Sequence, residues 1–288
     1  MTSISWTQAQ IRQIVEDSVQ FSKFETKRVS LLDKNVLSVP SDESRLNAIS
    51  IRNNTLRIME IVKALRTWNE INPHSDVERT KVFEIGLGYA EVALSIAQLG
   101  LGNVTGIEHP MRSFLFTPEY RQTLNQSNIA VVATNLLDKR LPFQDNAYDI
   151  SLFCEVIEHL PPTMVSSTLA EIARVTKPGG GIIIATPNLT CFSNRIAFLM
   201  GKSIDSPAIP MERAGGTYGH IRLYTPSDVA FLCKPFGLSM NSVWYSDAML
   251  LGGQERFAVK ILKYIGLAVS NIWQPLAHNW TALFIKDH

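Results

Sequence analysis

From Lys81 onward, short apolar runs alternate with stretches of helical periodicity, and few folds can accommodate this alternation. The apolar runs are KVFEIG, NVTGIE, IAVVAT, YDISLFC and GIIIAT, followed by LSMNSVWY and NWTALFIK near the end. Strands that alternate with helices form a mostly parallel sheet covered by helices on both faces. We therefore predict a doubly wound α/β domain, whose ligands bind at the residues that directly follow the strands.

The chain is long enough for one large core with attachments. It has 288 residues, of which 45% are hydrophobic and 18% charged, as in folded domains with a substantial core. Before the first strand, apolar residues recur at helical spacing around Ile14 and again around Leu56, with VLSVPSDES as a loop or hinge between them. The expected parts are an N-terminal helical extension or lid (1–76) and an α/β domain (77–288) with insertions at 187–225 and 247–276.

Charge and cysteine content exclude several classes of protein. The formal net charge is +1, so no electrostatic argument favours a nucleic-acid partner. Cys154, Cys191 and Cys233 form no CxxC pair, so neither a disulfide framework nor a zinc site is expected. The N-terminus lacks the pattern of a signal peptide, and no stretch reaches the roughly 18 apolar residues of a membrane span. We expect a cytoplasmic protein that contacts membranes at most peripherally.

The segment EIGLGYAEVA after the first strand carries the first candidate binding site. Gly86 and Gly88 permit a sharp turn that lets a ligand approach the backbone, and a helix start follows. A dinucleotide fingerprint requires a third glycine where Glu91 stands, and this carboxylate would repel a pyrophosphate. Glu84 and Glu91 instead suit a ligand with an adenosine, an amino group and a sulfonium cation. The turn therefore disfavours NAD.

Two further polar residues follow later strands. Glu108 ends the second strand, 24 residues after Glu84, where an acid can accept hydrogen bonds from both ribose hydroxyls of NAD or of S-adenosylmethionine. Asn135 follows the third strand, where its amide either binds the adenine edge or caps its own turn. The spacing alone leaves both cofactors open.

Four blocks in order carry a family resemblance: EIGLGYAEVA, VTGIE, LPFQDNAYDISLFCEVIEHL and RVTKPGGGIIIATPN. The chain resembles class I S-adenosylmethionine-dependent methyltransferases of the type 11 group over about residues 80 to 190. The resemblance implies a seven-stranded sheet with a reversed last hairpin and S-adenosylmethionine as cofactor. Two positions depart from the family pattern: Ala90 replaces its third glycine, and Asn135 replaces an acid, for which Asp138 is an alternative. The implied cofactor-binding residues are Glu84, Gly86, Gly88, Tyr89, Glu108, Asn135, Leu136 and Glu155.

The acceptor side is less clearly patterned. By the resemblance, Glu158 and His159 lie near the sulfonium and the acceptor, although they could instead cap the turn into the next helix. Residues 186–228 are weakly similar to ubiquinone-pathway O-methyltransferases, which implies His220 as a base or an acceptor contact. No metal site is evident. The candidate catalytic residues are therefore Glu158, His159 and His220, and the candidate substrate contacts are Asn188, Arg195, Arg222 and Tyr224, with Asn194 and Arg213 as further candidates.

The last insertion contains a basic amphipathic helix at about 254–276. Arg256, Lys260 and Lys263 recur at helical spacing on one face, while Ile261 and Ile265 lie on another. Such a helix can contact anionic lipid or a lipid-linked acceptor, or it can pack on the sheet or on a second copy in a homodimer.

We therefore expect an S-adenosylmethionine-dependent methyltransferase that acts on a small or carrier-linked metabolite of secondary or cell-envelope metabolism, more at oxygen than at nitrogen or carbon. One alternative is a non-catalytic scaffold that retains the cofactor site and binds a partner. The other is an NAD-dependent oxidoreductase, which Glu91 and the LPFQDNAYD block disfavour.

Overall fold

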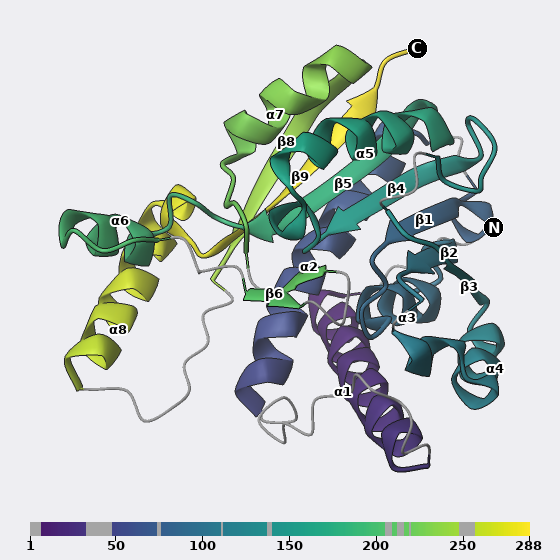
Figure 1. The fold of residues 1–288 in the computed structure, drawn as a ribbon, viewed down its shortest axis with the longest axis horizontal. Coiled ribbons are helices and arrows are strands. Elements are labelled where there is room, and N and C mark those ends of the chain that lie inside the picture. Colours follow the sequence, from purple (N-terminus) through teal and green to yellow (C-terminus); the bar gives the residue numbers. More distant parts are fainter. Residues whose placement is uncertain are drawn as a thin grey trace.

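A computed structural model describes residues 7–32, 48–73, 76–110, 112–136, 140–204, 209–211, 216–218, 220–247 and 257–288. Seven strands form one sheet in the order β3-β2-β1-β4-β5-β9-β8 (Figure 1). The first five in chain order are parallel, and β9 runs antiparallel to β5 and β8. Their bounds are β1 (Lys81–Ile85), β2 (Asn103–Glu108), β3 (Ile129–Ala133), β4 (Tyr148–Cys154), β5 (Thr176–Pro187), β8 (Leu238–Ser246) and β9 (Asn279–Lys286). This order confirms the predicted doubly wound sheet and the reversed last hairpin.

The central strands are apolar along nearly their whole length because helices cover both faces of the sheet. Residues 82–85 of β1 are all buried, as are residues 150–154 of β4. At the edge, β3 has exposed and half-buried residues. The continuous apolar runs in the sequence therefore correspond to the central strands.

One face of the sheet is covered by four helices from the first half of the chain, with α1 lying outside α2 and α3. Trp68 of α2 is buried against the sheet: its Nε1 donates to the Gly179 carbonyl at 3.3 Å. A Cβ added to Gly181 of β5 would lie 2.7 Å from the Trp68 ring, so the glycine makes room for the indole. Through Ile61, Leu65 and Trp68, α2 packs into an apolar core with the sheet. These helices are α1 (Gln8–Leu32), α2 (Ala48–Ile71), α3 (Glu91–Gln98) and α4 (Pro118–Gln126).

The opposite face is covered by α5 (Pro162–Val175) and α7 (Pro226–Cys233), which share a second apolar core with the sheet. α7 begins with a capping box, in which Thr225 and Asp228 exchange hydrogen bonds, and Pro226 occupies the first turn. The TPSD segment therefore starts a helix.

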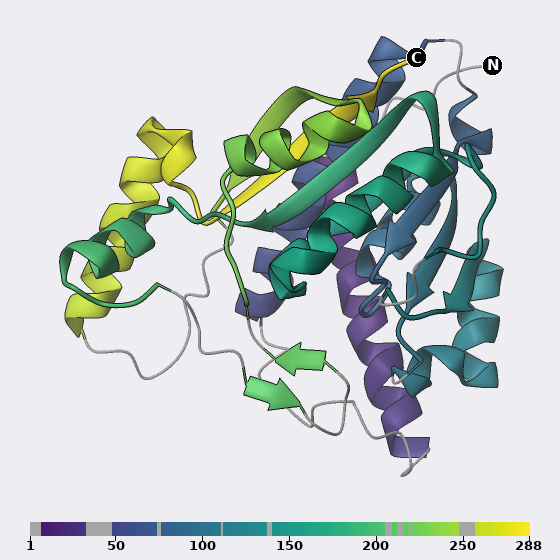
Figure 2. The ribbon, with the colours of Figure 1, turned by 45° about the horizontal axis from the view of Figure 1, so that its top comes forward.

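Two more helices, α6 (Phe192–Leu199) and α8 (Phe257–Ile272), lie side by side at one end of the molecule (Figures 1 and 2). A small hairpin of β6 (Ile209–Met211) and β7 (Gly216–Tyr218) lies apart from the main sheet. Among the described residues, no helix has the length and apolar character that crossing a bilayer requires. The 3-10 turns are η2 (Val77–Arg79), η3 (Ser113–Phe116), η4 (Ile157–His159), η5 (Lys234–Phe236) and η6 (Gln274–Leu276). The VLSVPSDES loop lies outside the described residues.

The strand order reverses between β1 and β4, because the chain proceeds from β1 outward to β2 and β3 and then returns to β4. In such sheets the helices after neighbouring strands diverge at the reversal and leave room for a ligand at the carboxyl ends. The turns that follow β1 and β4 are therefore where a binding site is expected.

Candidate active site

A cavity of about 160 Å³ lies at the carboxyl ends of β1 and β4, between the sheet and α2. The helix closes one side of the cavity, and the turn between β1 and α3 forms another. Of the expected cofactor contacts, Glu84, Gly86, Gly88, Tyr89 and Glu155 are brought together here. The complete lining is Arg57, Ile58, Ile61, Glu84, Gly86, Leu87, Gly88, Tyr89, Glu91, Val92, Cys154, Glu155 and Ala185.

The turn after β1 depends on a left-handed backbone at several positions. Gly86 and Gly88 have φ angles of 75° and 56°, which favour glycine. A Cβ at Gly86 would also lie 2.6 Å from Cγ2 of Val156, whereas one at Gly88 would meet nothing closer than 4.0 Å. Ala90, which stands for the family's third glycine, adopts φ 57° despite its side chain. The backbone at Ala90 therefore keeps the left-handed conformation that favours glycine, although alanine is strained in it.

Glu108 connects the glycine turn to the end of β2. Its Oε2 accepts a hydrogen bond from the Gly88 N–H at 2.8 Å, and its Oε1 accepts one from the His109 N–H at 2.8 Å. A carboxylate oxygen has a further lone pair, so each oxygen can still accept a ligand hydroxyl. Glu108 lies beside the cavity and is not part of its lining.

Glu84 is a buried acid at the end of β1. Its Oε2 has no hydrogen-bond partner among the described residues. Burial, and then the neighbouring carboxylates Glu108 and Glu91, raise the pKa of Glu84 well above its usual value. A cationic group in the cavity would stabilise the ionised form of this carboxyl and supply its missing partner.

Arg57 of α2 places a guanidinium in the cavity wall. Its Nη1 lies 2.6 Å from Oε2 of Glu155, and its Nη2 donates to Oδ1 of Asn54 at 2.9 Å. The Asn54 amide in turn donates to both oxygens of Glu91 at 3.0 and 3.2 Å. Burial opposes the charge on Arg57, but Glu155 and the other nearby carboxylates outweigh it and raise the pKa. Sequence reasoning missed Arg57, because no motif distinguishes it from other basic residues on that helix.

Tyr89 lines the cavity, with the Arg112 guanidinium 5.8 Å from its ring centroid. The last two expected cofactor contacts lie outside the lining. Asn135 and Leu136 follow β3 outside the cavity lining, and Leu136 packs against the second apolar core. The alternative, Asp138, falls outside the described residues.

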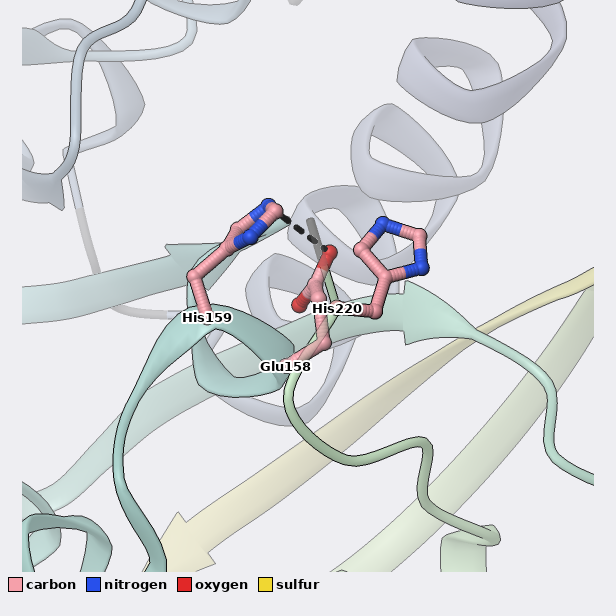
Figure 3. Close-up of side chains that lie close together, drawn as sticks. All are labelled: Glu158, His159 and His220. Atoms are coloured by element: carbon pink, nitrogen blue, oxygen red, sulfur yellow. Dashed lines mark ion pairs between the residues drawn. The ribbon is translucent and has the colours of Figure 1, made fainter. Parts of the chain in front are cut away.

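The three expected catalytic residues form a second cluster (Figure 3). Nε2 of His159 lies 3.8 Å from Oε1 of Glu158, and the rings of His159 and His220 are 5.1 Å apart in a T-shaped arrangement. The Glu158 carbonyl accepts hydrogen bonds from the Ile221 and Arg222 N–H groups at 2.7 and 3.3 Å. These bonds hold the segment that carries His220 against η4.

Burial sets the charges in this cluster. Glu158 is fully buried, and its Oε2 accepts a hydrogen bond from the Thr186 hydroxyl at 2.8 Å. Burial, together with the charge of Glu155, raises the pKa of Glu158 to about 8, so its carboxyl is mostly protonated at neutral pH. Burial and the neighbouring His159 lower the pKa of His220, which leaves a neutral imidazole able to accept a proton.

The alternative that Glu158 and His159 cap the next helix finds no support. The residue that precedes α5 is Pro161, and no side chain caps that helix. One ligand atom each from Glu158, His159 and His220 lie within 4.8 Å of one another. Imidazole nitrogens and a carboxylate are ligands of zinc and other transition metals, so this cluster could hold such an ion. The sequence had suggested no metal site, because His220 is remote from the other two along the chain.

Two of the expected substrate contacts are used inside the protein. The Asn188 amide donates to the carbonyls of Pro275 and Ala277 at 2.9 and 2.8 Å, which leaves it no N–H for an acceptor. Tyr224 is 1% exposed, and its carbonyl accepts a hydrogen bond from Nε1 of Trp280. These positions disfavour both residues as direct substrate contacts. The Asn188 amide is used to hold the segment before β9, and the Tyr224 side chain is buried.

The other expected contacts are more accessible. Arg195 is exposed on α6 and donates from Nε to the Thr190 carbonyl at 2.8 Å. Arg222 is exposed, with its guanidinium 5.2 Å from the ring centroid of Tyr224. The Asn194 amide donates to the carbonyls of Asn188 and Leu189. Arg213 lies outside the described residues.

Comparison with known proteins agrees with the fold. A family model described as a methyltransferase domain matches residues 83–184, from β1 through most of β5. Among solved structures, the fold resembles that of magnesium protoporphyrin IX methyltransferase from Synechocystis with bound S-adenosylhomocysteine. The TM-score is 0.54 at 12% identity, over 96% of this chain and 99% of that chain. An S-adenosylmethionine-dependent methyltransferase from Methanosarcina mazei gives 0.50 at 15% identity, over 76% and 97%.

Relatives in sequence cover the central part of the chain. The mitochondrial ubiquinone biosynthesis O-methyltransferase of Dictyostelium discoideum is 27% identical over 190 residues, which are 62% of this chain and 57% of that protein. The ubiquinone biosynthesis O-methyltransferase of Aromatoleum aromaticum is 26% identical over 191 residues, or 63% and 77%. The tRNA U34 carboxymethyltransferase of Nautilia profundicola is 22% identical over 188 residues, or 60% and 61%. Proteins with this degree of similarity to the chain are thus named for very different methyl acceptors.

The sheet order and the glycine turn at the reversal of that order define a class I methyltransferase fold. Residues 83–184 match the methyltransferase domain, and the chain is similar in sequence and in fold to S-adenosylmethionine-dependent methyltransferases.

Proposed function

We propose that this protein transfers the methyl group of S-adenosylmethionine to a hydroxyl group of a small or carrier-linked metabolite. The observation that carries the proposal is the cavity between α2 and the glycine turn, lined by the buried acid Glu84 and by the Arg57 guanidinium. The amino-acid part of the cofactor has one ammonium and one carboxylate group. The cavity offers one group of opposite charge for each.

The proposed binding mode follows from those charges. Glu84 lacks a partner for Oε2 and would accept a hydrogen bond from the ammonium group. Arg57 would bind the carboxylate with its planar fork and exchange part of its contact with Glu155. Glu108, which holds the turn through Gly88, would accept the ribose hydroxyls on its remaining lone pairs.

The acceptor proton needs a base when the acceptor is a hydroxyl. When bound, S-adenosylmethionine supplies a methyl group that the sulfonium has already activated for in-line displacement. We assign the base to His220, whose neutral imidazole lies beside His159 and is held by the Glu158 carbonyl through Ile221. His220 would take the proton from the acceptor oxygen as that oxygen forms its bond to the methyl carbon. The names of the two ubiquinone-pathway relatives agree with an oxygen acceptor.

Calorimetric titration of the purified protein with S-adenosylhomocysteine, beside NADH, tests the cofactor cavity. We expect S-adenosylhomocysteine to bind, and NADH to give no heat because Glu91 repels a pyrophosphate. Mass spectrometry then follows the gain of one methyl group on a panel of hydroxylated, amine and carbon acceptors. Binding without methyl gain on any acceptor would favour a non-catalytic scaffold, and binding of NADH alone would contradict the proposal.

Substitution of His220 tests the assignment of the base. His220→Asn should leave affinity for S-adenosylhomocysteine unchanged and lower the rate of methyl transfer by about 10²- to 10⁴-fold, the usual contribution of a general base. The matched control is His288→Asn, at an exposed histidine outside the cluster and the cavity lining, which should keep the parent rate. Equal rates for the parent and His220→Asn would remove His220 from the mechanism.

A further inference from the structure

The α6 and α8 pair carries most of the exposed large apolar side chains of the described residues. Eleven such side chains are exposed, and eight of them belong to α6, α8 or the residue that follows each helix. Isolated exposed apolar residues are common on folded proteins, whereas a concentration of them marks an interaction surface. We call these eight the α6–α8 face: Phe198, Leu199, Met200, Ile261, Tyr264, Ile265, Ile272 and Trp273.

On α8 the apolar stripe points away from the protein. Ile261, Tyr264, Ile265 and Ile272 lie at helical spacings of 3, 4 and 11 residues and are all exposed, so they share one side of the helix. The other side contacts the protein, since a Cβ added to Gly266 would lie 3.0 Å from the Phe192 ring of α6. An amphipathic helix that only packed on its own sheet would bury the apolar stripe.

A polar network holds the two helices in this orientation. His278, just before β9, pairs through Nδ1 with Oδ1 of Asp247, just after β8, at 2.6 Å. Ser193 of α6 contacts Nε2 of His278 at 3.2 Å, and Ser270 of α8 donates to the Asp247 carboxylate. Both helices are thus attached to the sheet where β8 ends and β9 begins. The apolar stripe therefore stays turned outward.

The two helices that carry the face have basic residues and no acidic ones in their sequence. Residues 192–204 and 257–273, which contain both helices, include no Asp or Glu. Tyr264 and Trp273 are aromatic side chains with a polar tip, which favour the boundary between water and a bilayer. The Arg195 guanidinium lies 5.9 Å from the centroid of the Trp273 ring, so a cation and an aromatic group occur together. The basic residues of the two segments are Arg195, Lys202, Lys260 and Lys263.

We propose that the α6–α8 face binds the surface of a bilayer that contains anionic lipid. Apolar and aromatic side chains would enter the boundary between headgroups and acyl chains, and the basic residues would attract the headgroups. A second copy of the chain fits less well, because a two-fold dimer would bring the Arg195 guanidinium, which lies beside Trp273 of the face, towards its like-charged copy. The proposal does not rest on the identity of the acceptor.

Co-sedimentation with vesicles tests the proposal on the full chain. The probes are vesicles of phosphatidylcholine alone and of phosphatidylcholine with phosphatidylglycerol in about equal parts. We expect binding to the anionic vesicles that weakens as salt is raised. Ile272→Asp and Leu199→Asp, at side chains that are 88% and 81% exposed, should each weaken the partitioning at least about tenfold. Phe231→Asp is the matched control, since Phe231 is 79% exposed on α7, away from the face.

Three outcomes would overturn the proposal. One is absence of binding to anionic vesicles by the parent chain. Another is equal partitioning of the parent and Ile272→Asp. The third is a dimer in sedimentation velocity that Ile272→Asp dissociates, without any lipid binding. S-adenosylhomocysteine titration of each variant separates this proposal from the proposed function, because substitutions of exposed residues on the face should leave cofactor affinity unchanged.

Discussion

At the scale of single residues, three glutamates near the ends of the central strands have different environments. Glu108 accepts hydrogen bonds from two backbone N–H groups. Glu84 and Glu158 are buried, each with one oxygen that lacks a hydrogen-bond partner among the described residues, and burial raises the pKa of both. The two buried acids are the groups most able to respond to a bound cation or to pH.

Glu158 should make the stability of the protein fall as pH rises. Its pKa is about 8 in the folded protein, against 4.5 for an unperturbed glutamate. Between these pH values the folded state holds a proton that the unfolded state has lost, so the free energy of unfolding decreases as pH increases. Glu158→Gln keeps the shape without the charge, and urea unfolding between about pH 5 and about pH 8 should then show a smaller decrease.

The control for Glu158→Gln is Glu70→Gln, which changes an exposed carboxyl on α2. This substitution should leave the pH dependence of the parent chain in place. A parent chain whose stability rises with pH over the same range, or an unchanged slope in Glu158→Gln, would show that Glu158 is ionised in the folded protein.

Glu84 should release a proton when the cofactor binds. Burial and the carboxylates of Glu108 and Glu91 raise the pKa of Glu84 and so favour its protonated form in the empty cavity, whereas the ammonium group of S-adenosylhomocysteine would favour the ionised form. Calorimetric titration in buffers of different ionisation enthalpy measures this release near neutral pH. Glu84→Gln should abolish the release and weaken binding, and a parent chain that releases no proton would place the ammonium group elsewhere.

At the scale of elements, α2 connects the N-terminal region to the cofactor cavity. Its residues Arg57, Ile58 and Ile61 line the cavity, while Trp68 at the other end of the helix packs on β5. The same helix therefore serves the binding site and the core. A displacement of α2 would open the cavity only by also disturbing the packing on the sheet.

The contribution of α2 to binding can be measured through Arg57. Arg57→Met should lower the affinity for S-adenosylhomocysteine by about 1.5–3 kcal/mol, the usual contribution of a hydrogen bond to a charged group. Arg57→Lys keeps the charge without the planar fork, so its affinity for S-adenosylhomocysteine should lie between those of the parent chain and Arg57→Met. Arg66→Met, on the same helix and outside the cavity lining, is the control. Affinity is measured by calorimetric titration. Equal affinities for Arg57→Met, Arg57→Lys and Arg66→Met would show that Arg57 does not bind the cofactor.

At the scale of the whole molecule, the sheet is enclosed by two apolar cores, and α2 is part of one of them. A detachable lid would expose little of the sheet when removed. The burial of Ile61, Leu65 and Trp68 against the strands indicates instead that the methyltransferase domain includes this helix.

Trp68 provides the test of this view. Trp68→Ala should lower the free energy of unfolding by about 3–5 kcal/mol, because it leaves a cavity against β5. Trp273→Ala removes the same side chain from an exposed position and should change stability by no more than about 0.5 kcal/mol. Urea unfolding followed by far-UV circular dichroism measures both. Equal and small losses would mean that α2 is a lid after all.

The sequence by itself determined the sheet and the ends of its strands. Apolar runs of strand length alternate with helical periodicity, and such patterns are local, so each element could be recognised without its neighbours. Residues at or directly after the ends of strands, such as Glu84, Glu108 and Glu155, could be proposed for the same reason, because parallel strands bring their carboxyl ends to one edge.

Only the tertiary structure decided which distant groups meet. Arg57 and Glu155 are 98 residues apart in the chain, and His220 reaches His159 through backbone hydrogen bonds to Glu158. Asn188 followed a strand as expected, but its amide is used to hold the turn before β9. A periodic pattern indicates that one side of a helix or strand is apolar. Which element packs against that side depends on segments that are remote in the sequence. For that reason the outward direction of the apolar stripe on α8 could not be predicted from the sequence.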